Sequence, residues 1–73
     1  MPIKITAHAK AQMKSRGIGK SLVFQTVMNP DSVSFDKRGG KLLSKSFGDE
    51  VLLVPIKDTR NDIIVKSVFF ERK

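Results

Sequence analysis

Three residues near the N-terminus carry side chains that can hold a phosphate and move a proton. His8, Gln12 and Arg16 follow one another at intervals of four residues. Each residue of an α-helix turns by about 100°, so the three drift by only about 80° in total and share one face. On that face Arg16 would grip phosphate oxygens, Gln12 would donate from its amide, and His8 would carry the proton. The spacing therefore predicts a site for phosphate chemistry.

The same side chains also have ordinary structural uses. A histidine in the first turn of a helix often caps it or packs against it. Arg16, near the helix C-terminus, would complement the helix dipole and bind the last carbonyl groups. Because spacing alone does not give the geometry that catalysis needs, the structural interpretation stays open beside the catalytic one.

Further basic residues extend the positive surface. Lys10 and Lys14 are one turn apart on a neighbouring helix face. Lys37 and Arg38 occupy the tip of a predicted hairpin, and Lys41 begins its return strand. We expect these five residues to contact a nucleic-acid backbone; the alternative for the hairpin is an ordinary solvated turn.

In the return strand, the alternation of side chains between the two faces places lysines and apolar residues on the same face. Lys41 and Lys45 fall on the same strand face as Leu43 and Phe47. A buried face should not carry two lysines, so we expect a bulge in this strand or an early end to it.

Net charge is the most informative global property. The 73 residues include 14 Lys and Arg against 7 Asp and Glu, a net charge of +7, with a pI near 10.2. Such a field attracts phosphate backbones and releases counterions on binding. The alternative is that this charge serves solubility alone, since a net charge of about 2–8 suits any small domain.

Other classes of chemistry find little support. The chain has no cysteine and one histidine, so neither a disulfide framework nor a thiolate metal site is available, and we expect no metal or cofactor. No Ser-His-acid set is readable. The N-terminus lacks the apolar region of a signal peptide, and no apolar run is long enough to cross a bilayer. We expect a cytoplasmic protein that does not contact membranes.

Two helices are predicted in the first half of the chain. Thr6 is a good N-cap for a helix over residues 7–16, and Gly17 suits its C-terminal end. A second helix follows Gly19 and ends at Asn29, because the residue before a proline is pushed out of the α region.

The second half reads as strands. Strands are expected over residues 32–36, 41–47, 51–56 and 63–70, separated by turns. Residues 3–5 suit a short strand or an extended lead-in. We therefore predict a single α+β domain over residues 1–73, in which two N-terminal helices pack on one face of a four-stranded, mainly antiparallel sheet.

One family resemblance arises from these residues. The run 5–9, then Met13, then 16–18, Val23 and 29–30, resembles the opening of the domain-of-unknown-function 4258 family, which typically reads HAxxRMxxRGI and then NP. That family is similar to RelE/BrnT-like toxins, which are small basic mRNA endonucleases paired with antitoxins. The resemblance implies a RelE-like fold and a metal-independent endoribonuclease, with His8 and Arg16 as catalytic residues.

Two departures accompany the resemblance. Gln12 stands where the family usually has arginine, and the closing strand lacks the tyrosine or histidine that RelE-like nucleases use near the C-terminus. A non-catalytic module that binds nucleic acid or an acidic protein is therefore the alternative to the toxin. The expected partners are RNA or the ribosome, with an antitoxin or a second copy of the chain as protein partners.

Overall fold

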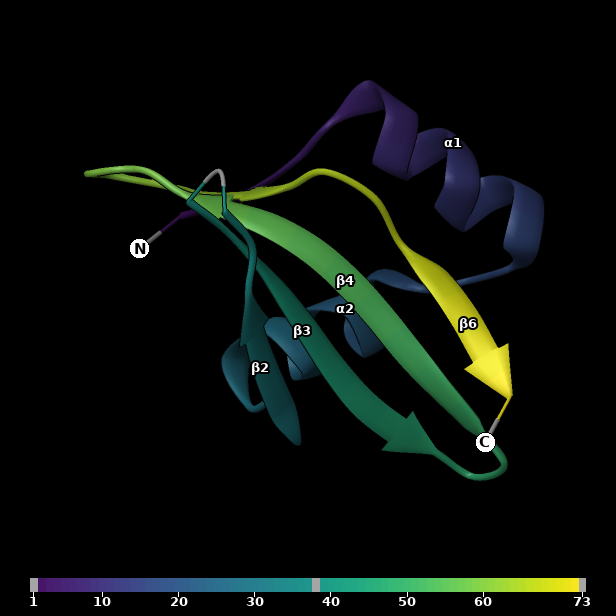
Figure 1. Cartoon of the computed structure of the whole chain (residues 1–73). Helices are drawn as coiled ribbons and strands as arrows, with labels where there is room; N and C mark the ends of the chain where they lie inside the picture. Colours follow the sequence, from purple (N-terminus) through teal and green to yellow (C-terminus); the bar gives the residue numbers. More distant parts are fainter. Residues whose placement is uncertain (1, 38, 73) are drawn as a thin grey trace.

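The computed structural model describes residues 2–37 and 39–72, which form two helices and six strands (Figure 1). In chain order these are β1 (Ile3–Ile5), α1 (Ala7–Arg16), α2 (Lys20–Met28), β2 (Ser32–Phe35), β3 (Gly40–Phe47), β4 (Glu50–Asp58), β5 (Ile63–Val65) and β6 (Phe69–Arg72). The fold is α+β, as predicted.

Both helices begin and end at the predicted residues. The Thr6 hydroxyl accepts a hydrogen bond from the Ala9 amide at 3.1 Å, which caps α1. Gly17 ends α1 in the left-handed conformation, with φ 66° and ψ 33°. The second helix, α2, follows Gly19 and ends at Asn29. No helix among the described residues is long and apolar enough to span a membrane.

The sheet is mixed rather than purely antiparallel. Its strand order is β1-β5-β4-β3-β2, with β6 also paired to β4. Every pair is antiparallel except β1 with β5, which run parallel. The long strand β4 pairs with β3 on one side; on its other side it pairs with β5 at one end and with β6 at the other. Strands β5 and β6 therefore lie end to end beside β4.

The predicted four-stranded sheet is therefore wrong. Residues 3–5 form a full strand parallel to β5, and the predicted strand over 63–70 is divided into β5 and β6 by residues 66–68. The first helix is the physical reason for the division. The Thr6 hydroxyl donates to the Lys66 carbonyl at 3.3 Å, and the Val68 amide donates to Gln12 Oε1 at 2.9 Å. The Lys66 amide still donates to the Pro55 carbonyl of β4 at 2.9 Å, but side chains of α1 and its cap bind the Lys66 carbonyl and the Val68 amide.

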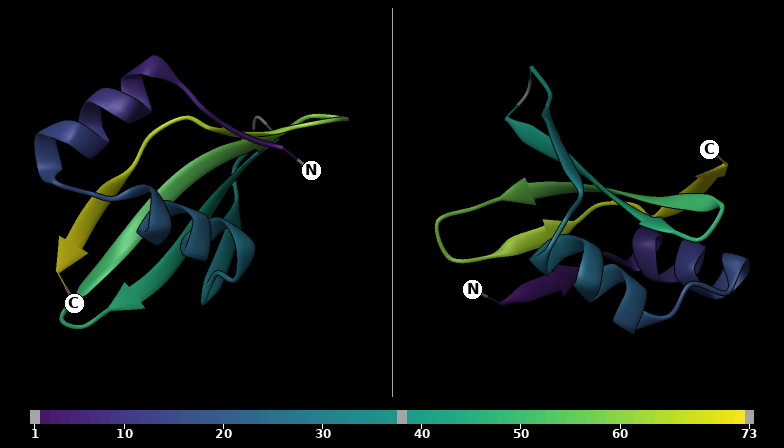
Figure 2. Two further views of the ribbon diagram at one scale, coloured as in Figure 1. Left: turned by 180° about the vertical axis from the view of Figure 1, so that it is seen from behind. Right: turned by 90° about the horizontal axis from the view of Figure 1, so that it is seen from below.

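The core lies between the helices and the sheet. On β4 the alternate residues Leu52, Val54 and Ile56 are buried on the helix side, and Leu43 of β3 lies opposite Val54. The buried cluster is completed by Ala9, Met13, Ile18, Val23, Val27, Val65 and Val68. Helix α2 contacts β3 and β4, and α1 contacts β6. Seen from below, the helices lie on one side of the sheet and the β2–β3 hairpin rises on the other (Figure 2).

The expected bulge in β3 is absent. Its register with β4 runs without interruption from Gly40 to Phe47, although Lys41 and Lys45 share the face of buried Leu43. Each lysine instead extends its aliphatic stem across this face and ends on polar partners. The ammonium group of Lys41 forms an ion pair with Asp58, a residue of β4.

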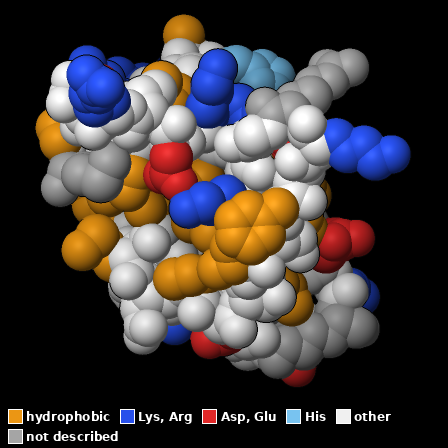
Figure 3. Space-filling model, turned by 60° about the vertical axis from the view of Figure 1, so that its left-hand side comes forward, with side chains coloured by type: hydrophobic (Ala, Val, Ile, Leu, Met, Phe, Trp, Pro, Cys, Tyr) orange, Lys and Arg blue, Asp and Glu red, His pale blue; other side chains and the backbone are white. Residues whose placement is uncertain are grey.

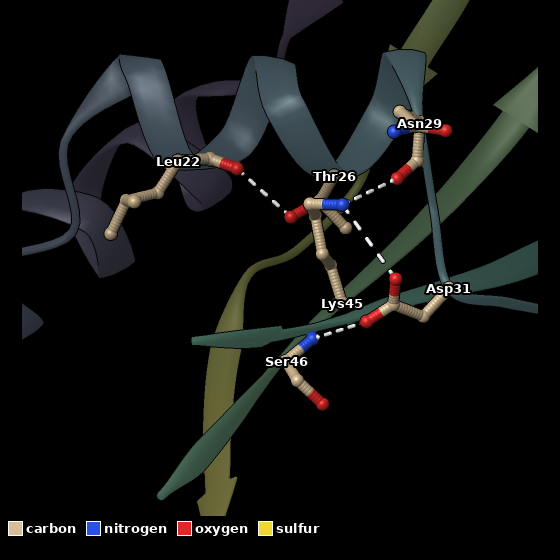
Figure 4. Close-up of polar contacts among 6 residues, drawn as sticks. All are labelled: Leu22, Thr26, Asn29, Asp31, Lys45 and Ser46. Atoms are coloured by element: carbon tan, nitrogen blue, oxygen red, sulfur yellow. Dashed lines mark hydrogen bonds and ion pairs between the residues drawn. The ribbon is translucent and has the colours of Figure 1, made fainter. Parts of the chain in front are cut away.

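Lys45 joins the end of α2 to the sheet. Its ammonium group donates to the Asn29 carbonyl at 2.9 Å and lies 3.6 Å from Asp31 Oδ1 (Figure 4). The second Asp31 oxygen accepts from the Ser46 amide at 2.8 Å, and the Asp31 amide donates to the Ser44 carbonyl at 2.7 Å. The connection from α2 to β2 is thereby fixed against β3, which explains how a regular strand carries two lysines on its core side.

Candidate nucleic-acid interface

Gln12 of the predicted site uses its amide oxygen to hold the chain. Gln12 Oε1 accepts from the Ser67 hydroxyl at 2.6 Å and from the Val68 amide at 2.9 Å. Val68 is fully buried, so this bond satisfies an amide that water does not reach. Gln12 is thus first an anchor between α1 and the start of β6. A hydrogen bond from Gln12 to a phosphate, as predicted, would have to come from the side-chain amide nitrogen.

Arg16 makes the next contact along the same helix face. Its Nη1 donates to the Val68 carbonyl at 3.2 Å. The other guanidinium N–H groups form no hydrogen bond with the described residues, and the residue is exposed. A guanidinium fork that is held at one nitrogen and free at the others is oriented in advance for an anion.

An open pocket lies where these two side chains meet β6. Its volume is about 580 Å³. The lining residues come from α1, the start of β4 and the segment leading into β6: Gln12, Arg16, Glu50, Ser67, Phe69 and Phe70. The pocket combines one cation, one carboxylate and two half-buried aromatic rings. This mixture suits an unpaired nucleotide, because rings stack on bases, arginine binds phosphate, and a carboxylate accepts from base amino groups.

His8 lies outside that pocket. It is exposed, and its side chain makes no hydrogen bond or ion pair with the described residues. Eight residues separate it from Arg16, which corresponds to about 12 Å along the helix axis. The two side chains therefore cannot both grip one phosphate in the way that the helical spacing suggested. They would contact different positions along one strand.

Lys10 and Lys14 do not extend the surface of Gln12 and Arg16. Lys10 precedes Gln12 by two residues, a turn of about 200°, so it projects from the opposite flank of α1. There it lines a second pocket of about 420 Å³. Lys14 is exposed on the same outer side of the helix.

The hairpin residues are also separate from α1. Lys37 is exposed beside the turn, and Arg38 lies outside the described residues. The hairpin rises from the side of the sheet opposite to the helices (Figure 2). Lys41 is half-buried, forms an ion pair with Asp58 and lies 5.8 Å from the centre of the Phe35 ring. Its charge is used within the fold, unlike the charge of Lys37.

Figure 3 shows Lys and Arg side chains at the upper edge of one face, near the histidine, and further ones at its centre and right-hand edge, with hydrophobic side chains in the middle of that face. Residues 2–37 and 39–72 contain no group of three or more His, Asp or Glu side chains that could hold a metal ion.

The comparison with known families extends over almost the whole chain. The sequence model of a family described as a domain of unknown function (DUF4258) matches residues 5–70. The chain belongs to the DUF4258 family. No curated protein and no solved structure matches the chain.

The residues of the helix motif noted in the sequence of this DUF4258 chain divide into two groups. Met13 and Ile18 are buried in the core, and Gly17 ends α1 in a left-handed conformation. These three serve the fold. His8 and Arg16 belong to the same motif but are exposed; among the described residues the His8 side chain makes no hydrogen bond, and Arg16 bonds only through Nη1.

Sequence reasoning missed several residues that the structure brings to the two pockets. Phe69, Phe70 and Glu50 join Arg16, although β4 and β6 are distant from α1 in the sequence. Lys4 and Lys20 join Lys10 in the second pocket. No local pattern connects residues so far apart, so only the sheet topology reveals them.

Proposed function

We propose that this DUF4258 protein binds single-stranded RNA along the flank of α1 that carries His8 and Arg16. The observation that carries the proposal is the division of the motif: its apolar and glycine residues build the fold, whereas His8 and Arg16 are left exposed. The net charge of +7 supplies the general attraction to a phosphate backbone.

The aromatic residues of the first pocket favour an unpaired strand over a duplex. Phe69 and Phe70 line the same pocket as Arg16 and are half-buried. A base can stack on such a ring only after it has left a double helix, and its phosphate would then lie within reach of the guanidinium. The 2′-hydroxyl of RNA would find polar partners in the Ser67 hydroxyl and the Glu50 carboxylate, which line the pocket too.

A titration of fluorescein-labelled single-stranded RNA at several salt concentrations tests this proposal. We expect affinity to fall steeply with salt, and Arg16→Ala to lower it by roughly tenfold, the value of one charged contact with a phosphate. Lys57→Ala is the matched control, because Lys57 is an exposed lysine of β4 that is in neither pocket. Equal losses in the two variants, or salt-independent binding, would contradict the proposal.

The second candidate function is metal-independent RNA cleavage, as in RelE/BrnT-like toxins. It is favoured by one observation: the His8 side chain is exposed and makes no hydrogen bond within the described chain. In this chemistry the ribose 2′-OH attacks the adjacent phosphate and the 5′-oxygen of the next nucleotide leaves. His8 would move the proton at the scissile phosphate, and Arg16 would hold a neighbouring phosphate of the same strand, because the two side chains are too far apart to act on one phosphate.

Cleavage is tested separately from binding. RNA incubated with the protein in a chelator should yield 2′,3′-cyclic phosphate ends, and expression should arrest growth. His8→Ala should abolish cleavage while RNA binding stays within about twofold of the wild type. RNA that stays intact with the wild-type protein would reject catalysis and leave RNA binding as the function, whereas equal cleavage by His8→Ala would reject His8 as the proton carrier.

A further inference from the structure

The pocket on the other flank of α1 gathers lysines from three separate elements. Its lining residues come from β1, α1 and α2: Ile3, Lys4, Ile5, Lys10, Lys20 and Phe24. The volume of about 420 Å³ falls within the usual range for small-molecule sites, about 300–1,000 Å³. Three of the six lining side chains are lysines, and none is acidic.

The charges in this pocket are only partly balanced. The Lys4 ammonium group lies 3.3 Å from Asp62 Oδ2. The ammonium groups of Lys10 and Lys20 make no ion pair or hydrogen bond within the described residues. The like charges of these lysines repel one another, and a bound anion offsets this repulsion because it attracts each ammonium group.

An aromatic ring and an apolar floor complete the pocket. Phe24 is 40% exposed, so part of the ring is open to a ligand while the rest packs against the protein. The half-buried side chains of Ile3 and Ile5 lie on the helix side of the sheet and form the apolar part of the lining. The pocket thus offers two different chemistries: cations for an anion, and an open aromatic face for a flat apolar group.

We propose that this pocket binds a nucleoside phosphate, with the phosphate held by Lys10 and Lys20 and the base against Phe24. Stacking of a base on an aromatic side chain tolerates any base, because each has a π-face. The lysines act as point charges and recognise the phosphate without fixed geometry. The ligand is a free nucleotide or the terminal nucleotide of an RNA, which share this chemistry.

The site does not depend on the function proposed above. Lys10 projects from the flank of α1 opposite to Gln12 and Arg16, and the two pockets have no lining residue in common. A substitution of Arg16 that abolishes RNA binding would leave this pocket unchanged, and a substitution of Lys10 or Lys20 would leave the Arg16 pocket unchanged. The competing interpretation is that Lys10 and Lys20 are simply solvated and that Phe24 is surface exposed without a ligand.

Titrations of the full chain with AMP, adenosine and inorganic phosphate, followed by amide NMR, test the proposal. We expect AMP to bind and to shift the amide signals of residues around the pocket. Adenosine and phosphate alone should each bind at least roughly tenfold more weakly, because each keeps one of the two contacts. No AMP binding, or equal affinity for AMP and phosphate, would overturn the proposal.

Three variants assign the contacts. Lys10→Ala and Lys20→Ala should each weaken AMP binding several-fold and reduce its salt dependence, whereas the control Lys57→Ala should not. Phe24→Leu should weaken AMP binding while Phe24→Tyr restores it, because only the tyrosine keeps a ring. The amide spectra show whether each variant is folded. AMP binding that all of these variants retain would place it elsewhere and overturn the proposal.

The origin of the ligand is decided by comparing AMP with a short RNA that carries a 5′-phosphate and with the same RNA lacking it. Stronger binding of the phosphorylated RNA than of AMP, sensitive to Lys20→Ala, identifies an RNA end as the ligand. Equal binding of both RNAs, with AMP bound more tightly, identifies the free nucleotide.

Discussion

Gln12 of α1 accepts a hydrogen bond from the amide of Val68, 56 positions later in the chain, at 2.9 Å. The same oxygen accepts from the Ser67 hydroxyl, and Arg16 donates to the Val68 carbonyl. One helix face therefore binds both backbone groups of Val68, the last residue before the sheet resumes at β6. The flank of α1 proposed to contact RNA is held rigidly by these bonds, because they join it to the buried core.

The first prediction concerns this anchor. Gln12→Ala removes the acceptor for the buried Val68 amide, so we expect the free energy of unfolding to fall by about 1–3 kcal/mol. Gln12→Glu keeps an oxygen at the same position and should lose much less. Urea denaturation measures both. Gln25→Ala is the control, because the exposed Gln25 side chain bonds only to the Ser21 hydroxyl at 3.1 Å. An equal loss of stability in Gln12→Ala and Gln25→Ala would contradict the prediction.

The second prediction uses two glycines that flank the turn between the helices. Neither Gly17 nor Gly19 has an atom within 4 Å of an added Cβ, but Gly17 has φ 66° whereas Gly19 has φ −76°. Gly17→Ser should therefore cost about 1–2 kcal/mol of stability from backbone strain. Gly19→Ser should be neutral or stabilising, because serine is a good N-cap residue. Thermal unfolding of the two variants compares them, and equal melting temperatures would refute the role of φ.

Local signals in the sequence predicted most of the elements. Thr6, Gly17 and Pro30 mark helix ends through capping and through backbone restriction, which act within a few residues. The hairpin with Lys37 and Arg38 at its tip and Lys41 in its return strand was predicted, and the register places Phe35 opposite Lys41. Such signals need no knowledge of the rest of the chain.

Features that depend on distant partners were not predictable in this way. The apolar run over 63–70 reads as one strand, because nothing within it reveals that Gln12 will bind Val68. The position of Lys45 on a core face is explained only by the Asn29 carbonyl and Asp31, which the end of α2 places beside it. The same limit applies to the candidate sites, whose lining residues are assembled by the topology of the sheet.

The third prediction concerns Asp31, which fixes the start of β2 to β3. Asp31→Ala removes the acceptor for the Ser46 amide, so we expect a loss of about 1–2 kcal/mol. Asp31→Asn keeps an acceptor and should lose less. A double-mutant cycle with Lys45→Ala should give a coupling of only about 0.5 kcal/mol, because the pair is 3.6 Å apart and Asp31 is half exposed. A larger coupling would show that the ion pair, rather than the backbone bond, stabilises this connection.

The fourth prediction separates the lysines of the hairpin by function. Lys41 is half-buried and paired with Asp58, whereas Lys37 is exposed and has no ion pair with the described residues. Lys41→Ala should therefore lower stability by up to about 1 kcal/mol and reduce RNA affinity no more than the control Lys57→Ala, which also removes one charge. Chemical denaturation and RNA titration at fixed salt measure the two effects. If Lys41→Ala weakened RNA binding well beyond Lys57→Ala while stability stayed constant, Lys41 would belong to the interface after all.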